Sequence, residues 1–222
     1  SLTWLALRPQ VLPRVRAGLV LGLLGDGAPL QYKRSRRGDT LTDRAAAHVL
    51  AGIEGARLLD FEPYGYDERQ YGSPGFDLPV GRLTRSVNGG YPEYHCSADD
   101  MTLLRPESLA GALQALARLA QVLDGNRRLI NLSPFGEPRL GRRGLYRSTG
   151  GHAPGAFEHA LLWVLSQSDG THDLLAIDER ARQPFETHEA AAEALQQAGP
   201  LRDREPDEPA PAFTIPGSQT PK

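Results

Sequence analysis

Hydrophobic residues gather in short runs through the first half of the chain, and each run has the length of a β-strand. The longest is AGLVLGLL, at residues 17–24, in which no polar residue interrupts the apolar ones. Such a run is typical of a strand buried on both faces of a sheet. Shorter runs predict strands at residues 57–61 and 78–83, and residues 30–37 look like a further strand with a basic end.

Apolar residues at helical spacing lie between and after these runs. A long helix is predicted over 105–123, with Gly125 beyond its end. The stripe expected to form its core face consists of Leu109, Leu113, Leu116, Leu119, Ala120 and Leu123. A second helix is expected over 41–52, with Asp39 or Thr40 as its cap. Because strands and helices alternate, the sequence predicts an α/β domain over residues 1–140.

Residues 145–202 carry a different pattern. Three helical segments, at 156–168, 172–182 and 187–197, are separated by Asp-Gly-Thr and Gln-Pro-Phe turns. Three short helices so closely spaced are typical of a small winged helix-turn-helix domain. Residues 203–222 are rich in proline and charge and poor in apolar residues, so we expect a disordered tail.

The third of these helices would be the recognition helix if the domain bound DNA. It carries Glu186, His188, Glu189 and Glu193, and phosphate would repel the three carboxylates. The net charge of −2 adds no attraction for nucleic acid or an anionic membrane. We therefore expect this domain to contact a protein partner or to self-associate, and we expect neither nucleic acid nor a membrane as a partner.

The composition limits the chemistry. Hydrophobic residues make up 40% of the chain, which is enough to form a core. The single cysteine, Cys96, excludes an intrachain disulfide and a cysteine-rich zinc site, and it favours a reducing compartment such as the cytoplasm. No apolar run reaches the roughly 18 residues that a membrane span requires.

The polar stretch 61–101 is the richest in candidate chemistry. It contains the cluster Asp67-Glu68-Arg69, a Gly-Ser-Pro-Gly turn and the segment EYHCSADD, which holds His95. Loops fixed on a rigid scaffold often carry functional groups, so this stretch suits the lip of a site. Both features also have plain alternatives, a solvated loop for the cluster and an ordinary hydrogen-bonded histidine for His95.

Two more positions allow two interpretations each. Asp26 follows the 17–24 run, at the edge where α/β sheets place their ligands, or it is a turn residue between two glycines. The cations of the 30–37 run could bind a phosphate or carboxylate, or could protect an edge strand from aggregation, which we favour. These cations are Lys33, Arg34, Arg36 and Arg37.

Five segments of the chain are long enough to be specific: GLVLGLLGD (18–26), YKRSRRGD (32–39), PYGYDERQYGSPGFDLPVG (63–81), PEYHCSADD (92–100) and LGRRGLYR (140–147). In these segments the chain resembles bacterial proteins that have a zinc aminopeptidase-like domain and a C-terminal winged helix. Several of those proteins are encoded near polysaccharide-biosynthesis genes. The resemblance covers nearly all of residues 1–201, and it implies the C-terminal half of a mixed sheet covered by helices.

The wider superfamily, zinc aminopeptidases and glutaminyl cyclases, implies a metal site. By this resemblance Asp26 and His95 would each hold one of two zincs. Cys96 stands where a threonine is usual, and Gly72 where many relatives have cysteine. The family's first histidine, bridging aspartate and glutamate pair have no counterpart here. The resemblance implies that they precede Ser1, so this chain would hold no catalytic residue and would be inactive alone.

The same resemblance implies a peptide or small amide as substrate and metal-assisted hydrolysis in the intact protein. The substrate lip would consist of Asp67, Glu68, Arg69 and Tyr71. An acidic group there could hold a free α-amine, and the arginine a carboxylate. Two alternatives rank lower, a non-catalytic scaffold that kept the fold and a winged-helix regulator whose first domain senses a ligand.

Overall fold

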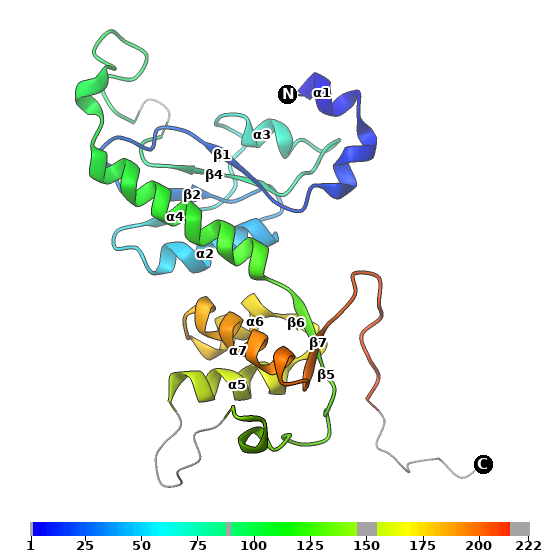
Figure 1. Cartoon of the computed structure of the whole chain (residues 1–222). Coiled ribbons are helices and arrows are strands. Elements are labelled where there is room, and N and C mark those ends of the chain that lie inside the picture. The colour runs from blue at the N-terminus through cyan, green and yellow to red at the C-terminus, as the bar shows by residue number, and fades with distance from the viewer. Residues whose placement is uncertain (1, 88–89, 146–154, 214–222) are drawn as a thin grey trace. The chain divides into compact units, whose positions relative to one another are not determined.

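The structure is a computed structural model that describes residues 2–87, 90–145 and 155–213. The chain forms two compact units, Ser1–Asp124 and Gly125–Lys222. Each unit mixes helices with strands, so the predicted α/β fold class is confirmed (Figure 1). Within the described residues, no helix is both long enough and apolar enough to cross a membrane.

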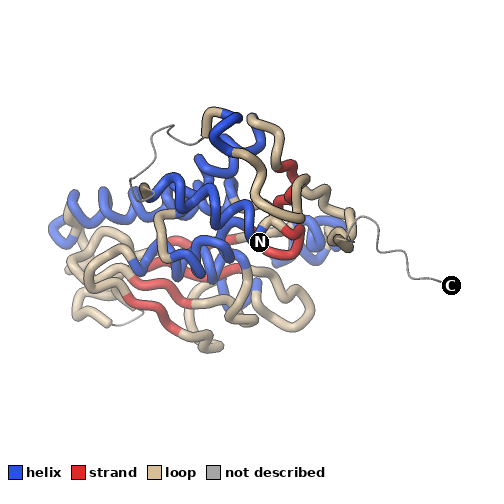
Figure 2. The backbone as a smooth tube through the Cα atoms, turned by 90° about the horizontal axis from the view of Figure 1, so that it is seen from below, coloured by secondary structure: helices blue, strands red, loops and turns tan. Residues whose placement is uncertain are grey.

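The first unit is built on a four-stranded mixed sheet in the order β1-β4-β2-β3 (strands red in Figure 2). β1 pairs in parallel with β4, β2 in parallel with β3, and β2 antiparallel to β4. Three of the four strands fall within the runs expected from the sequence, and β4 extends one residue beyond its run. Their bounds are Gly18–Leu21 for β1, Gln31–Lys33 for β2, Arg57–Leu59 for β3 and Val80–Thr84 for β4.

Two expectations about this sheet are wrong. β1 was expected to be buried on both faces, but it lies at the edge of the sheet and Leu21 is 48% exposed. β2 was expected at the edge, yet it lies between β4 and β3, and Lys33 is only 3% exposed. The local pattern could not show this, because a cation can be buried only where another part of the chain supplies its partners.

Helices cover both sides of this sheet. Figure 1 shows α3 (Glu68–Tyr71) and α2 (Leu41–Ala51) on opposite sides of it. α3 packs on β4, and α2 packs on β2, β3 and β4. The chain begins with α1 (Leu2–Ala6) and the 3-10 helix η1 (Pro9–Arg14), and the 3-10 helix η2 (Met101–Leu103) precedes the last helix of the unit.

That last helix, α4 (Pro106–Gly125), buries only part of the expected stripe, since Leu119 is buried but Leu109 is exposed. Ala112, Ala115, Leu119 and Val122 are at most 3% exposed. Leu113, expected in the core, is 68% exposed. The helix is rotated from the leucine stripe toward its alanines, whose small side chains let a helix approach its neighbours closely.

A buried carboxylate ties α2 to the sheet. Asp43 Oδ1 accepts hydrogen bonds from Tyr32 Oη at 2.9 Å and from the Ser35 amide at 2.7 Å. Its Oδ2 accepts from the hydroxyls of Ser35 and Thr40 and from the Thr40 amide, which completes a capping box at the start of the helix. Burial alone would raise the pKa of Asp43, but these hydrogen bonds outweigh it and lower the pKa.

We expect Asp43→Asn to lower the free energy of unfolding of the first unit by about 1–3 kcal/mol, since buried donors lose their acceptor. The carboxylate's folded pKa lies below the ordinary 3.8. Its contribution is therefore fully present above that value and is lost as the pH falls through the folded pKa. Urea unfolding at neutral and at acidic pH measures both effects.

The exposed Asp39→Asn is the matched control for this prediction. It should leave the free energy of unfolding and its pH dependence unchanged. Equal acid sensitivity of the wild type and Asp43→Asn would contradict the assignment.

The second unit places three helices on a small antiparallel sheet of order β6-β5-β7. The strands are β5 (Arg128–Asn131), β6 (Asp169–Asp173) and β7 (Leu201–Asp203). The helices are α5 (Ala156–Gln167), α6 (Leu174–Ala181) and α7 (Phe185–Gln197), and the 3-10 helix η3 (Leu140–Arg143) lies between β5 and α5.

β5 differs from its expected role. The sequence placed residues 128–131 in the first domain, which was expected to run to residue 140, but β5 pairs with both β6 and β7. The division between the units therefore lies near residue 125 rather than 140. Part of the expected tail is also ordered, because Arg204 Nη1 donates to the Gly170 carbonyl at 2.8 Å. Residues 214–222 lie outside the described residues.

His188 was expected on the surface of the third helix, but it is fully buried. Its Nδ1 lies 3.0 Å from Asp178 Oδ1, so the pair links α7 to α6. Glu186 and Glu193 remain exposed on α7. The helix thus presents carboxylates to solvent and uses its histidine for packing.

Candidate functional site

Three charged side chains meet on the α3 side of the first sheet. Lys33 and Arg82 face each other in the antiparallel register of β2 and β4, which would be repulsive alone. Glu68 of α3 lies between them, with Oε1 2.7 Å from Lys33 Nζ and 3.3 Å from Arg82 Nη1. The three side chains are 1–4% exposed. We call this group the buried charge triad.

The loop before α3 wraps around the triad. Lys33 Nζ also donates to the carbonyls of Glu62, at 2.9 Å, and Tyr64, at 2.7 Å. The Tyr66 amide donates to Glu68 Oε2 at 3.1 Å. The triad therefore fixes the loop that the sequence identified as a site lip.

Gly65 lies directly over the triad. Its φ of +151° belongs to a region that other residues rarely adopt. A Cβ there would lie 2.9 Å from Arg82 Nη1 and 3.0 Å from Lys33 Nζ, and closer still to Glu68 Oε1. Only glycine lets the backbone approach the three charges this closely.

Aromatic rings continue from the triad toward the candidate histidine. The guanidinium carbon of Arg82 lies 5.2 Å from the centre of the Tyr66 ring. Tyr66 Oη donates to Tyr94 Oη at 3.4 Å, and the Tyr94 ring stacks on His95 with centroids 4.0 Å apart. Burial and the contact with Tyr94 raise the pKa of Tyr66, so this hydroxyl stays protonated.

The same aromatic group reaches toward Asp26. The ring of Tyr91 packs edge-on against Tyr94 at 5.6 Å, and its hydroxyl donates to Asp99 Oδ2 at 3.3 Å. Burial raises the pKa of Tyr91 first, followed by the charge of Asp99, and the charge of Asp26 contributes further.

Asp26 sits in a loop that other groups hold firmly. Its Oδ1 accepts from the Ala28 amide at 2.7 Å and its Oδ2 from the Ser86 amide at 3.2 Å. Arg85 donates to the carbonyls of Leu24 and Ala28 at 3.0 and 2.7 Å. The contact with the Ala28 amide is the one expected if Asp26 is a turn residue. The contact with the Ser86 amide ties the carboxylate to the segment that follows β4.

Carboxylate and imidazole are the kinds of ligand that zinc takes, so Asp26 and His95 suit the metal in chemistry. Two ligands are too few for a catalytic zinc, which usually takes three protein ligands. Over the described ranges, no three His, Cys, Asp or Glu side chains form a group that could hold a metal. His95 is exposed, with a φ of +58°.

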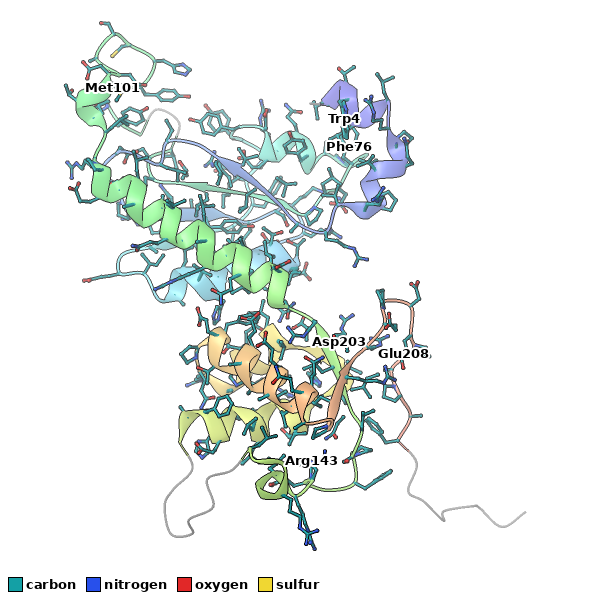
Figure 3. All side chains as sticks on the ribbon, in the orientation of Figure 1. Trp4, Phe76, Met101, Arg143, Asp203 and Glu208 are labelled. Atoms are coloured by element: carbon teal, nitrogen blue, oxygen red, sulfur yellow. The ribbon has the colours of Figure 1, made fainter. Side chains whose placement is uncertain are left out.

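The four expected lip residues take different places. Glu68 is part of the buried charge triad, and Tyr71 packs with Phe76 against the core cluster of Leu5, Leu78 and Val80. Figure 3 shows Phe76 near Trp4 at this end of the unit. Asp67 and Arg69 are exposed, and Arg69 Nε donates to the Gly65 carbonyl at 3.2 Å.

Sequence reasoning did not single out Arg82, Tyr66 or Tyr91. Arg82 had a signal, because it is the one charged residue inside an otherwise apolar strand run. A charge at such a position requires a buried partner. The tyrosines had none, since their roles come from contacts between distant loops.

Comparison with known proteins is consistent with this architecture. A winged helix-turn-helix family model matches residues 127–203, so the second unit is a winged helix domain, as predicted. A family model described as "Domain of unknown function (DUF4910)" matches residues 1–126. The chain belongs to this family.

Two matches, one to a named protein and one to a crystal structure, come from Clostridium acetobutylicum. One, 39% identical over 198 residues, is provisionally named as a polysaccharide biosynthesis protein with an aminopeptidase-like domain. The match covers 88% of this chain and 45% of the relative. The other is a crystal structure provisionally described as a peptidase, with 34% identity and a TM-score of 0.81, over 91% of this chain and 45% of that one. The chain thus spans about half the length of these proteins.

We expect Glu68→Gln to destabilise the first unit by about 3–5 kcal/mol, because it leaves two facing cations buried without a counter-charge. Asp67→Asn, one residue away and exposed, is the matched control and should change the free energy of unfolding by less than about 0.5 kcal/mol. Chemical denaturation measures both. A loss in Glu68→Gln no larger than in the control would show that the triad is not buried in solution.

Gly65→Ala should also destabilise the unit, by at least about 1–3 kcal/mol, because of the unfavourable φ and the collision with the triad. The control is Gly75→Ala, where a Cβ would have no neighbour within 4 Å and φ is not positive. Thermal unfolding of the two variants compares them directly. Equal melting temperatures would contradict the close approach of Gly65 to the triad.

Proposed function

We propose that the first unit supplies part of the site of a peptidase-like hydrolase in the whole protein. The observation that carries the proposal is the link from the loop around Glu68 to His95 through Tyr66 and Tyr94. The descriptions of the clostridial relative and of the solved clostridial structure support the same class of activity. Because the chain spans about half their length, the proposal concerns the whole protein.

Within this proposal Asp26 and His95 are metal ligands. The two amides on Asp26 would hold its carboxylate in place, and the ring of Tyr94 would hold the imidazole. Since two donors do not complete a zinc site, the rest of the whole protein would supply the other ligands and the general base. A zinc bound there would supply Lewis-acid chemistry for amide hydrolysis.

The lip residues divide into two roles. Asp67 and Arg69 are exposed and could meet the α-amine and a carboxylate of the substrate. Glu68 and Tyr71 are engaged in the triad and the core, so they would act as positioning residues. The amide could belong to a peptide or to an acylated sugar, and the name of the clostridial relative gives the second class some support.

A non-catalytic scaffold is the second candidate. The specific observation in its favour is that the described residues bring together no group of three metal ligands. The regulator hypothesis has weaker support, since the carboxylates of Glu186 and Glu193 are exposed on α7 and would repel DNA. These carboxylates suit contact with a basic protein surface.

Elemental analysis of the whole protein tests the proposal. We expect about one or two zincs per chain, with at least one lost in Asp26→Ala and in His95→Ala. His159→Ala, an exposed histidine in the second unit, is the matched control and should keep its zinc. Full zinc content in both ligand variants would contradict the assigned ligands, and absence of zinc from the wild type would favour the scaffold.

A further inference from the structure

We propose that a cavity beside Arg82 binds the carboxylate of a small zwitterionic ligand, either an amino acid or the C-terminal end of a short peptide. The cavity lies entirely within the first unit and has a volume of about 330 Å³. The buried cations Lys33 and Arg82, the apolar side chains of Leu59 and Val87, and the exposed carboxylates of Asp60 and Glu62 line it.

The two cations differ in how fully they are satisfied. Lys33 Nζ donates to the carbonyls of Glu62 and Tyr64 and forms an ion pair with Glu68 Oε1 at 2.7 Å. Among the described residues, the carboxylate nearest to Arg82 is Glu68, at 3.3 Å, and the Tyr66 ring lies over its guanidinium. Its Nε and Nη1 are buried and make no hydrogen bond with any described residue.

The charge in this region is therefore unbalanced. Two cations face one carboxylate, and Glu68 already accepts from Tyr66 and lies against Lys33. Burying an unpaired guanidinium is costly, so an anion at Arg82 would stabilise the site. A carboxylate in the cavity could accept a charge-assisted hydrogen bond from the part of the Arg82 guanidinium that lines it.

The exposed acids select among anions. Asp60 and Glu62 also line the cavity, and a phosphate dianion bound there would be repelled by both. An ammonium group would be attracted to them. An amino acid or a dipeptide carries a carboxylate and, a few bonds away, an ammonium group. Its carboxylate would pair with Arg82, and its ammonium group with Asp60 or Glu62.

This inference deepens the proposed function, on which its biological meaning rests, by naming the class of substrate or product that the unit would hold. The binding itself requires no metal. It can therefore be measured on protein kept free of metal by a chelator. Failure of the zinc assignment and failure of the carboxylate site are then separate results.

The experiment is calorimetric titration of metal-free protein with L-alanyl-L-alanine and with its C-terminal amide. We expect the dipeptide to bind and its amide to bind at least about 10-fold more weakly, since a charge-assisted contact is lost. Arg82→Gln should weaken dipeptide binding by a similar factor. Undetectable binding of the dipeptide, equal binding of the amide, or wild-type binding by Arg82→Gln would overturn the proposal.

Circular dichroism would show whether Arg82→Gln unfolds. If it does, two further variants still test the site. Val87→Trp fills the cavity from a partly exposed position and should abolish binding without altering the charges. The double variant Asp60→Asn/Glu62→Gln should bind the dipeptide no better than its N-acetyl derivative. Unchanged binding in Val87→Trp, or inorganic phosphate binding as tightly as the dipeptide, would overturn the site or its ligand class.

Discussion

One carboxylate, Glu68, is the counter-charge shared by two buried cations, and it holds the loop of the candidate site in place. Glu68 enters the sheet face from a helix of only four residues, which has little stability of its own. Its contacts with Lys33 and Arg82 hold the helix and the loop before it in place. Tyr66 of that loop donates a hydrogen bond to Tyr94, whose ring stacks on His95. The position of His95 therefore depends on the ion pairs of Glu68 with Lys33 and Arg82.

On the opposite side of the same sheet, the buried charged group is a carboxylate rather than a pair of cations. There a single buried carboxylate, Asp43, receives its hydrogen bonds from neutral groups, and no cation is needed among the contacts described. The α2 side is fully satisfied and serves packing, whereas the α3 side keeps a guanidinium that is only partly paired and lies against a cavity. Function is therefore expected on the α3 side.

The sequence predicted where helices and strands lie along the chain better than it predicted which strands pair with one another. Strand runs and helix stripes follow from local periodicity, which is why β1 to β4 and the winged helix were found. The edge position of β1, the interior position of β2 and the assignment of β5 to the second unit depend on pairing between distant segments. Among site residues, Lys33 was noticed as a cation but not as a buried one, because its partner Glu68 is 35 positions later.

A double-mutant cycle on Glu68 and Lys33 tests the central claim most directly. If Glu68 neutralises the buried cations, Glu68→Gln/Lys33→Met should be more stable than the sum of the single variants predicts, by about 1–3 kcal/mol. Removing one cation relieves the repulsion that the loss of the carboxylate exposes. Additive losses in the free energy of unfolding would mean that the two side chains do not interact, and the account of the loop and its site would fail.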